Sequence, residues 1–233
     1  MRRAGANLMA LTVLDIVQGT DEWLQARCGI VTASVVGKLI TPTLKVADNE
    51  TSRGLTLSLV AERITGHVDE TFMSADMWRG IEDEPIARDL YREHHAPVEE
   101  VGLMVRDEDE WGYRIGYSPD GLVGDEGLIE CKSRLQKVHL RTILTDEIPA
   151  ENMAQLQCGL LVSGRAWIDY LSYCGGMPLW TKRVYPDPTW FDAIVQAVAK
   201  FESNAAAYAF RYREAVRGLP TTERVERGSE IEF

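Results

Sequence analysis

The chain has 233 residues, of which 45% are hydrophobic, 26% charged and 8% aromatic, and this composition excludes disordered, collagen-like and coiled-coil proteins. Its net charge of −11 argues against a protein that coats nucleic acid with a broad basic face, because such binding scales with the phosphates that lysine and arginine neutralise. The charge is compatible with an enzyme that binds a few phosphates and coordinates a metal ion with several carboxylates.

The rest of the composition favours a cytoplasmic protein without membrane contact. No stretch approaches the ~20 apolar residues of a membrane helix, and the apolar run that ends at Leu14 lacks the cleavage site of a targeting segment. The four cysteines are widely spaced without a CxxC pair, which indicates a reducing compartment rather than a zinc or iron–sulfur site. We expect one domain over residues 1–217 and a polar tail over 218–233.

Capping and turn residues predict helices through the first part of the chain. Thr32 and Ser74 are suitable N-cap residues, Pro42 ends one helix, and Gly66 is a good residue to follow another. The predicted helices cover residues 20–27, 32–40, 52–65 and 74–95.

After Pro97 the pattern changes to short apolar runs separated by turn clusters, which are typical of strands. The predicted strands cover residues 98–105, 113–117, 128–133, 166–173 and 181–185. Further helices with apolar stripes are predicted over residues 136–144, 150–162 and 188–216. Because helices occur on both sides of a central block of strands, the pattern predicts an α/β fold with a central mixed β-sheet flanked by helices.

The most informative stretch is the sequence Ser118-Pro119-Asp120-Gly121, which is followed after a short interval by Glu130-Cys131-Lys132. Residues two apart in a strand point to the same face, so Glu130 and Lys132 lie side by side. A hairpin-like return across the turn at Asp120 brings its carboxylate near that of Glu130. Two neighbouring carboxylates repel each other unless a cation lies between them, and their oxygens suit Mg²⁺ or Mn²⁺.

The Lys132 ammonium can orient a water molecule and stabilise charge that develops on a phosphoryl oxygen. Together with the two carboxylates, it favours metal-assisted hydrolysis of a phosphodiester. The alternative is an ordinary Asp-Gly turn beside a strand with solvated charges, and the apolar neighbours Leu128 and Ile129 weigh against it.

A third carboxylate is available on the fourth predicted helix. Periodicity alone does not choose among Glu82, Asp83 and Glu84.

Near the N-terminus, Arg27 comes just before a turn, and Thr32-Ala33-Ser34 begins a helix. A guanidinium, hydroxyl groups and free backbone N–H groups together can hold a phosphate. The alternative is a capped helix with an arginine on its surface.

The order and spacing of these motifs resemble the lambda-type (YqaJ-like) viral recombinase exonucleases of the PD-(D/E)xK nuclease superfamily. The similarity extends from about Gln18 to about Tyr173, and the Ser-Pro-Asp-Gly and Glu-x-Lys pair is its most specific part. The other matching positions are Trp23, Arg27, Thr32-Ala33-Ser34, Gly80, Glu84, Ala87, Arg88, Met153, Gln155 and Gln157.

The resemblance implies a role for several of the matching positions. Asp120 and Glu130 would bind the metal with the backbone carbonyl of Cys131, and Glu84, in the family's helical acidic position, would bind it directly or through water. Lys132 would position the attacking water. Gln155, rather than Gln157, matches the family's active-site glutamine. The residues that match the 5′-phosphate pocket are Arg27, Ser34 and Ser118. The motif-level similarity does not place the DNA contacts of Arg134, Lys137 and Arg141, or those of residues 42–72.

The resemblance also implies a restriction-endonuclease-like fold and an Mg²⁺-dependent exonuclease, with Mn²⁺ as a substitute. Such an enzyme degrades one strand of linear double-stranded DNA from its phosphorylated 5′ end and leaves 3′ overhangs for a single-strand annealing protein. A homotrimer in the cytoplasm of a bacterial host is the form that the family suggests.

Two other functions are compatible with the sequence: an endonuclease or resolvase of the same superfamily, and a non-catalytic DNA-binding protein. The joint presence of Glu84, Asp120, Glu130 and Lys132 argues against the binding protein, which has no need of them.

Overall fold

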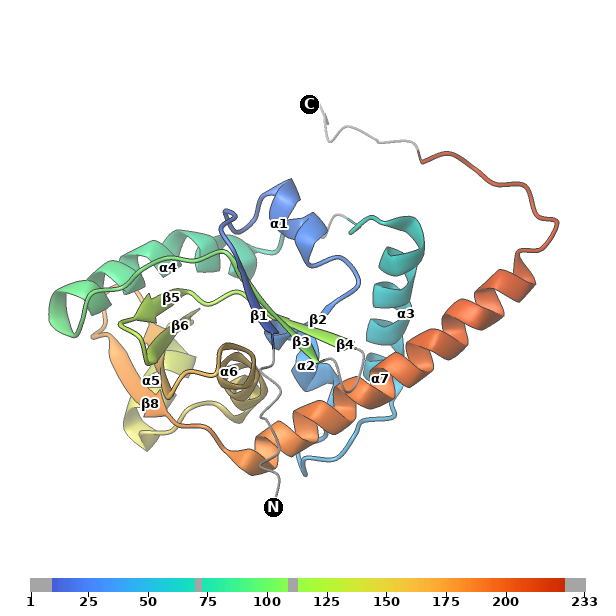
Figure 1. Cartoon of the computed structure of the whole chain (residues 1–233). Coiled ribbons are helices and arrows are strands. Elements are labelled where there is room, and N and C mark those ends of the chain that lie inside the picture. Colours follow the sequence, from blue (N-terminus) through green and yellow to red (C-terminus); the bar gives the residue numbers. More distant parts are fainter. Residues whose placement is uncertain (1–9, 70–72, 109–112, 225–233) are drawn as a thin grey trace, which may run out of the picture.

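The strands of the computed structural model form two four-stranded sheets (Figure 1). The structure describes residues 10–69, 73–108 and 113–224. The first sheet has the order β1-β3-β4-β2, with β1 (Ala10–Leu14), β2 (Val31–Thr32), β3 (Leu103–Glu108) and β4 (Tyr113–Tyr117). The second has the order β5-β6-β7-β8, with β5 (Gly121–Val123), β6 (Gly127–Ser133), β7 (Trp167–Tyr173) and β8 (Trp180–Val184).

Each sheet is mixed. In the first, β2 and β4 are parallel and the other pairs are antiparallel, and in the second only β6 and β7 are parallel. Helices flank both sheets, so the predicted α/β class is confirmed. The strands that we expected in one central sheet divide into two, because the chain leaves β4 at Tyr117 and begins a new antiparallel pair at Gly121.

The helices follow the predicted pattern closely. They are α1 (Asp21–Ala26), α2 (Ala33–Val36), α3 (Glu50–Thr65), α4 (Ala75–His94), α5 (Gln136–Thr145), α6 (Ala150–Ser163) and α7 (Pro188–Ala215). The helix predicted over 32–40 is shorter, since α2 gives way to a 3₁₀ turn at Gly37–Leu39. Glycine is a weak helix former, which explains the change at Gly37.

Side-chain caps explain where the two long helices of the first half begin. Asn49 and Ser52 form a reciprocal capping box on α3, and Ser74 accepts a hydrogen bond from the backbone N–H of Met77 on α4. Each cap satisfies an N–H that has no partner within the helix and contributes about 1 kcal/mol. Gly66 ends α3 with a φ of 67°, a left-handed conformation that suits glycine.

Three short strands were missed, namely β1, β2 and β5. The apolar run that ends at Leu14 forms the edge strand β1. The structure describes this run only from residue 10 onward. The strand predicted over 98–105 begins only at Leu103, because Glu99 pairs instead with Leu122 of β5. None of the described helices is long and apolar enough to cross a membrane.

The helix α6 lies between the sheets and contacts β3 and β4 on one side and β7 on the other. Leu156 and Leu160 of α6 are fully buried, and each such side chain stabilises the fold by about 1.5–3 kcal/mol. A Cβ at Gly159 would lie 2.7 Å from Cζ of Tyr117, so the helix approaches β4 too closely for a larger residue.

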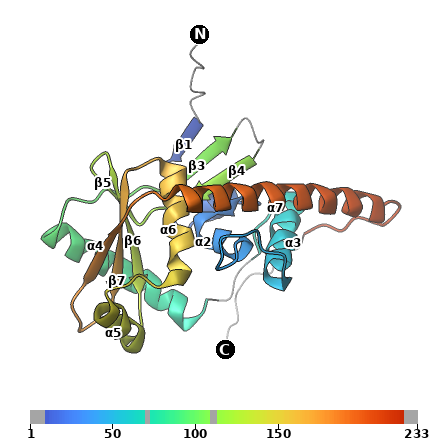
Figure 2. The same ribbon diagram turned by 90° about the horizontal axis from the view of Figure 1, so that it is seen from below.

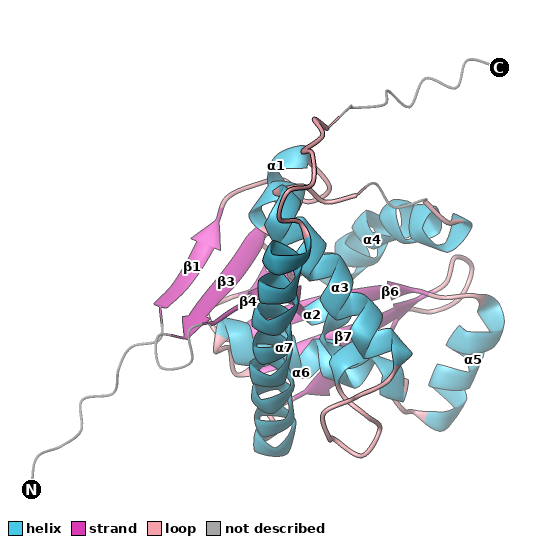
Figure 3. Ribbon diagram, turned by 90° about the vertical axis from the view of Figure 1, so that its right-hand side faces the viewer, coloured by secondary structure: helices cyan, strands magenta, loops and turns pink. Residues whose placement is uncertain are grey.

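Other helices cover the outer faces. Ala87 and Tyr91 of α4 pack on Ile129 and Leu171 of the second sheet. The long helix α7 packs against α3 and α6 (Figure 2), and it lies in front of both in Figure 3. The exposed residues 218–224 follow α7, and the rest of the predicted tail lies outside the described residues.

Candidate active site

Two carboxylates meet where β5 and β6 pair. The register joins Gly121 to Ile129, so the next position places Asp120 opposite Glu130. Oδ2 of Asp120 accepts a 2.6 Å hydrogen bond from the backbone N–H of Cys131. A Cβ at Gly121 would lie 2.2 Å from a side-chain carbon of the adjoining segment, so close packing, rather than a turn, requires glycine beside Asp120.

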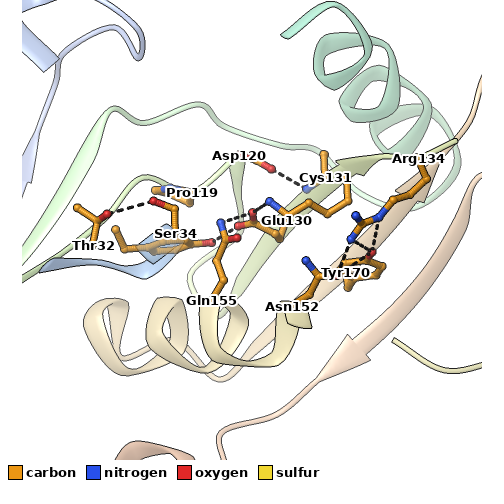
Figure 4. A network of polar contacts seen from close by, with 12 residues as sticks. Thr32, Ser34, Pro119, Asp120, Glu130, Cys131, Arg134, Asn152, Gln155 and Tyr170 are labelled. Atoms are coloured by element: carbon orange, nitrogen blue, oxygen red, sulfur yellow. Dashed lines mark hydrogen bonds and ion pairs between the residues drawn. The ribbon is translucent and has the colours of Figure 1, made fainter. Parts of the chain in front are cut away.

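Glu130 is 1% exposed and accepts hydrogen bonds from three side chains (Figure 4). Nζ of Lys132 donates to Oε1 at 2.6 Å, and Nε2 of Gln155 donates to the same oxygen at 2.5 Å. The hydroxyl of Tyr117 donates to Oε2 at 3.3 Å. A carboxylate this deeply buried is stable only with such partners, so these donors hold Glu130 in one position.

A third carboxylate reaches this cluster from α4. Oε1 of Glu84 accepts a 3.1 Å hydrogen bond from Nη2 of Arg88, one turn further along the helix. Nη1 of Arg88 donates to the backbone carbonyl of Asp120 at 3.0 Å. Arg88 therefore ties α4 to the hairpin and holds Glu84 beside it.

The structure also distinguishes the three acidic residues that periodicity left open. Glu82 is exposed, and Asp83 accepts a 2.6 Å hydrogen bond from the hydroxyl of Ser133. Only Glu84 is near enough to raise the pKa of Asp120. Glu84 is thus the member of this acidic run that belongs to the cluster.

The cluster carries more negative charge than its surroundings balance. Burial raises the pKa of Asp120 well above its usual range, and repulsion by Glu130 and Glu84 raises it further. Burial also raises the pKa of Glu84, although Arg88 opposes this effect. Burial by itself lowers the pKa of Lys132, but the attraction of Glu130 and Asp120 outweighs it, so the ammonium stays charged. A divalent cation would relieve this repulsion.

The donor set fits a hard divalent cation, because carboxylate and peptide oxygens are the ligands that Mg²⁺ and Mn²⁺ prefer. Across residues 10–69, 73–108 and 113–224, however, no three His, Cys, Asp or Glu side chains form a ready-made metal site. Both oxygens of Glu130 accept hydrogen bonds from the protein. Metal binding through Oε1 therefore requires Lys132 and Gln155 to move off that oxygen.

A second group of polar side chains gathers at the start of α2. The guanidinium of Arg27 lies 4.2 Å from the ring centre of Trp23 and donates through Nη2 to Oγ1 of Thr32 at 3.2 Å, with a longer contact of 3.5 Å to Ser34. Nε1 of Trp23 donates to the hydroxyl of Ser118 at 2.8 Å. The structure thus brings Arg27, Ser34 and Ser118 together. Among the described residues, the hydrogen-bond partners of the Arg27 side chain are hydroxyl groups, and the carboxylate of Glu62 acts on its charge from beyond ion-pair distance.

One cleft extends from the Arg27 group to Glu84 of the carboxylate cluster. It has a volume of about 1160 Å³, and its lining includes Trp23, Arg27, Thr32, Glu84 and Arg88. Burial lowers the pKa of the half-buried Arg27, and the nearby carboxylate of Glu62 partly opposes this effect. A bound anion would restore the interactions that water no longer supplies.

The two glutamines of α6 have different surroundings. Gln155 reaches Glu130, whereas Gln157 donates to the backbone carbonyl of Tyr185 and accepts from the backbone N–H of Asp187. Gln157 therefore fastens the segment before α7 and lies away from the cluster.

The sequence patterns did not assign a role in the site to several residues that lie in or beside it. Tyr117 is the last residue of β4, and its contact with Glu130 crosses from one sheet to the other. Arg134 stands two residues after Lys132, and Asn152 stands three residues before Gln155 on the same helix. Spacing along the strand and the helix could have identified these last two residues as neighbours of the site.

The model of the YqaJ-like viral recombinase domain family matches residues 22–166. No curated protein matches the sequence. A solved alkaline exonuclease of Laribacter hongkongensis is 33% identical, with a TM-score of 0.75 over 86% of this chain and 100% of that one. A second structure of that exonuclease, in complex with dAMP, gives the same values. A phage-related exonuclease of Haemophilus somnus is 13% identical, with a TM-score of 0.56 over 80% of this chain and 96% of that one, and shares the fold.

Proposed function

The chain belongs to the YqaJ-like viral recombinase domain family, and from this premise we propose that it is an Mg²⁺-dependent 5′-to-3′ exonuclease of linear double-stranded DNA. One observation carries the proposal. A single cleft contains an arginine held by neutral groups and a carboxylate of a cluster with excess negative charge. The first can bind a terminal phosphate and the second can hold a metal at the bond to be cut.

The proposed metal ligands are Asp120, Glu130 and the backbone carbonyl of Cys131, with Glu84 bound directly or through water. Mn²⁺ is the expected substitute. When bound, the metal supplies a Lewis acid for the phosphate and lowers the pKa of its water. The raised pKa values of Asp120 and Glu84 support this assignment, because a cation offsets the repulsion behind them.

Lys132 acts as a hydrogen-bond donor in this mechanism. Its raised pKa keeps it protonated at neutral pH, so it cannot serve as the base that accepts a proton. If Glu130 held a cation, Nζ of Lys132 would be released from its carboxylate and could hold the attacking water and stabilise charge on a phosphoryl oxygen. Gln155, which donates to the same oxygen of Glu130, would be released in the same way.

The direction of digestion follows from the phosphate pocket. We propose that Arg27, Ser34 and Ser118 hold the terminal 5′-phosphate, which places the first phosphodiester at the carboxylates. The Laribacter hongkongensis exonuclease has been solved with dAMP, and a nucleoside monophosphate is the product that we propose for this chain. The complementary strand is left as a 3′ overhang.

The remaining proposals concern the setting of the reaction. We expect a single-strand annealing protein to receive the overhang, a homotrimer to enclose the duplex, and the enzyme to act in the cytoplasm of a bacterial host. An enzyme held around DNA by its shape needs few phosphate contacts, which suits the acidic composition.

Digestion of a duplex labelled separately at its 5′ and 3′ ends, with Mg²⁺ or with EDTA, tests the proposal. We expect labelled mononucleotide from the 5′ end first, no reaction in EDTA, and no cleavage of closed circular DNA. Early release of the 3′ label would contradict the polarity. Cleavage of the circle would instead indicate an endonuclease or resolvase, and binding without cleavage in either metal would indicate a DNA-binding protein.

A further inference from the structure

A second arginine lies at the end of β6. Figure 4 shows Thr32 and Ser34 on one side of Glu130 and Arg134 on the other. The backbone N–H of Arg134 donates to the carbonyl of Tyr173 at 2.8 Å, so the chain is still held to β7 at this point. The position of Arg134 is therefore fixed by the sheet that carries the carboxylates.

The side chain of Arg134 is anchored as firmly as its backbone. Its Nη2 donates to Oδ1 of Asn152 at 2.5 Å, and its Nε and Nη2 donate to the hydroxyl of Tyr170 at 3.3 and 3.0 Å. The same hydroxyl donates to Asn152 at 3.3 Å, and both partners are buried. A guanidinium held in this way has already lost most of the entropy that binding a ligand would cost.

Both partners of Arg134 are neutral. Asn152 carries no charge, and a tyrosine hydroxyl such as that of Tyr170 is protonated at neutral pH. Among the residues that the structure describes, Arg134 has no carboxylate within ion-pair distance, whereas Arg88 pairs with Glu84 and Arg183 with Asp169. Its Nη1 also has no hydrogen-bond partner there. The charge of Arg134 is thus available to an anion.

This arrangement repeats the chemistry of the Arg27 pocket on the opposite side of Glu130. Resting on the proposed function, we infer that Arg134 binds the phosphate of the digested strand that follows the scissile phosphodiester on its 3′ side. A strand whose 5′-phosphate lies at Arg27 and whose first phosphodiester lies at Glu130 continues toward Arg134. Asn152 and Tyr170 are positioning residues that hold the guanidinium for this contact.

A neutral methylphosphonate placed at the second linkage from the 5′ end tests the inference, with the single-turnover rate of release of the first nucleotide as the measurement. We expect this substitution to slow the wild-type enzyme about 10- to 100-fold, the effect of losing a hydrogen bond to a charged group. Arg134→Ala should slow the unmodified substrate to a similar extent and should lose no further rate with the methylphosphonate. Additive losses would overturn the inference.

Matched controls separate this contact from a general loss of charge. Arg141→Ala removes an exposed arginine of α5 and should leave the full methylphosphonate effect in place. A methylphosphonate at the fifth linkage should act additively with Arg134→Ala.

Tyr170→Phe provides a second variant if Arg134→Ala does not fold. It removes the oxygen that accepts two of the hydrogen bonds from Arg134, and we expect a smaller loss of rate with a reduced methylphosphonate effect. An unchanged methylphosphonate effect in Tyr170→Phe would also overturn the inference. If the wild-type enzyme does not release nucleotides at all, the proposed function fails as well; digestion with additive losses overturns the Arg134 contact alone.

Discussion

The two sheets contribute unlike halves of the candidate site. The second sheet supplies buried acidic groups, Asp120 and Glu130, and one ammonium, that of Lys132, which contacts Glu130. The first sheet and the helix that follows β2 supply hydroxyl groups around an arginine; Thr32 is buried, whereas Arg27 and Ser34 are more exposed than the two carboxylates. The proposed chemistry and the proposed recognition of the DNA end therefore reside in separate parts of the fold, so a substitution should be able to remove either one without the other.

The largest effect is expected on the second sheet. Lys132→Ala removes the donor that we propose for the attacking water, and the single-turnover rate should fall by about 10³-fold or more while binding of a DNA end persists. Lys137→Ala, which removes an exposed lysine of α5, is the matched control and should retain activity. Wild-type turnover in Lys132→Ala would remove the proposed mechanism.

On the first sheet, the expected effect is on selectivity. Arg27→Ala should reduce the preference for 5′-phosphate over 5′-hydroxyl ends by about 10- to 100-fold, since a charge-assisted contact is lost, and should leave the rate on hydroxyl ends nearly unchanged. Competition between the two duplexes measures this ratio. Arg53→Ala, on the surface of α3, serves as the control. If Arg27→Ala kept the wild-type ratio, the pocket would be wrongly assigned.

The excess charge of the second sheet predicts a dependence on pH. Protons compete with Mg²⁺ for Asp120 and Glu84, and the raised pKa values of both groups extend this competition above the ordinary carboxylate range. Mg²⁺ affinity should therefore rise with pH, by up to about tenfold per unit for each proton displaced, and level off above the raised pKa values. Calorimetric titration at several pH values measures it. An affinity that is flat from acidic to neutral pH would contradict the coupling.

The smallest effect concerns stability without metal. A carboxylate whose pKa is raised by folding costs stability as the pH rises from its unfolded pKa toward its folded one, and the cost is complete above the folded pKa. Asp120→Asn removes that charge and can still accept from the N–H of Cys131. In EDTA at alkaline pH, we expect Tm to rise by about 2–4 °C, the shift that ~1 kcal/mol gives a chain of this length, although activity is lost. A lower Tm would show that the carboxylate stabilises the fold.

The sequence predicted those features that depend on neighbours along the chain. Caps at Ser74 and Gly66 mark helix ends, alternation in a strand places Glu130 beside Lys132, and a hairpin brings Asp120 back to them. The choice of Glu84 and Gln155 needed the family resemblance, because helical spacing alone leaves several acidic residues and two glutamines equivalent.

Contacts that depend on packing of distant segments could not be predicted in the same way. Trp23 meets Ser118 across 95 residues, and Tyr170 meets Arg134 because β6 and β7 pair in parallel. No local pattern specifies that register. The division into two sheets was missed for a related reason, since β2 and β5 are too short to produce a clear alternating pattern.

The segment from Ser118 to Asp120 leaves the first sheet and enters the second, and it joins the two halves of the site through only two peptide units. Such a connection spans at most about 7 Å and has little freedom around Pro119. If Ser118 holds the DNA end and Asp120 holds the metal, the short covalent connection fixes the distance between the bound 5′-phosphate and the site of cleavage. That distance would set the released fragment at one nucleotide, and a longer connection would change the length of the fragment.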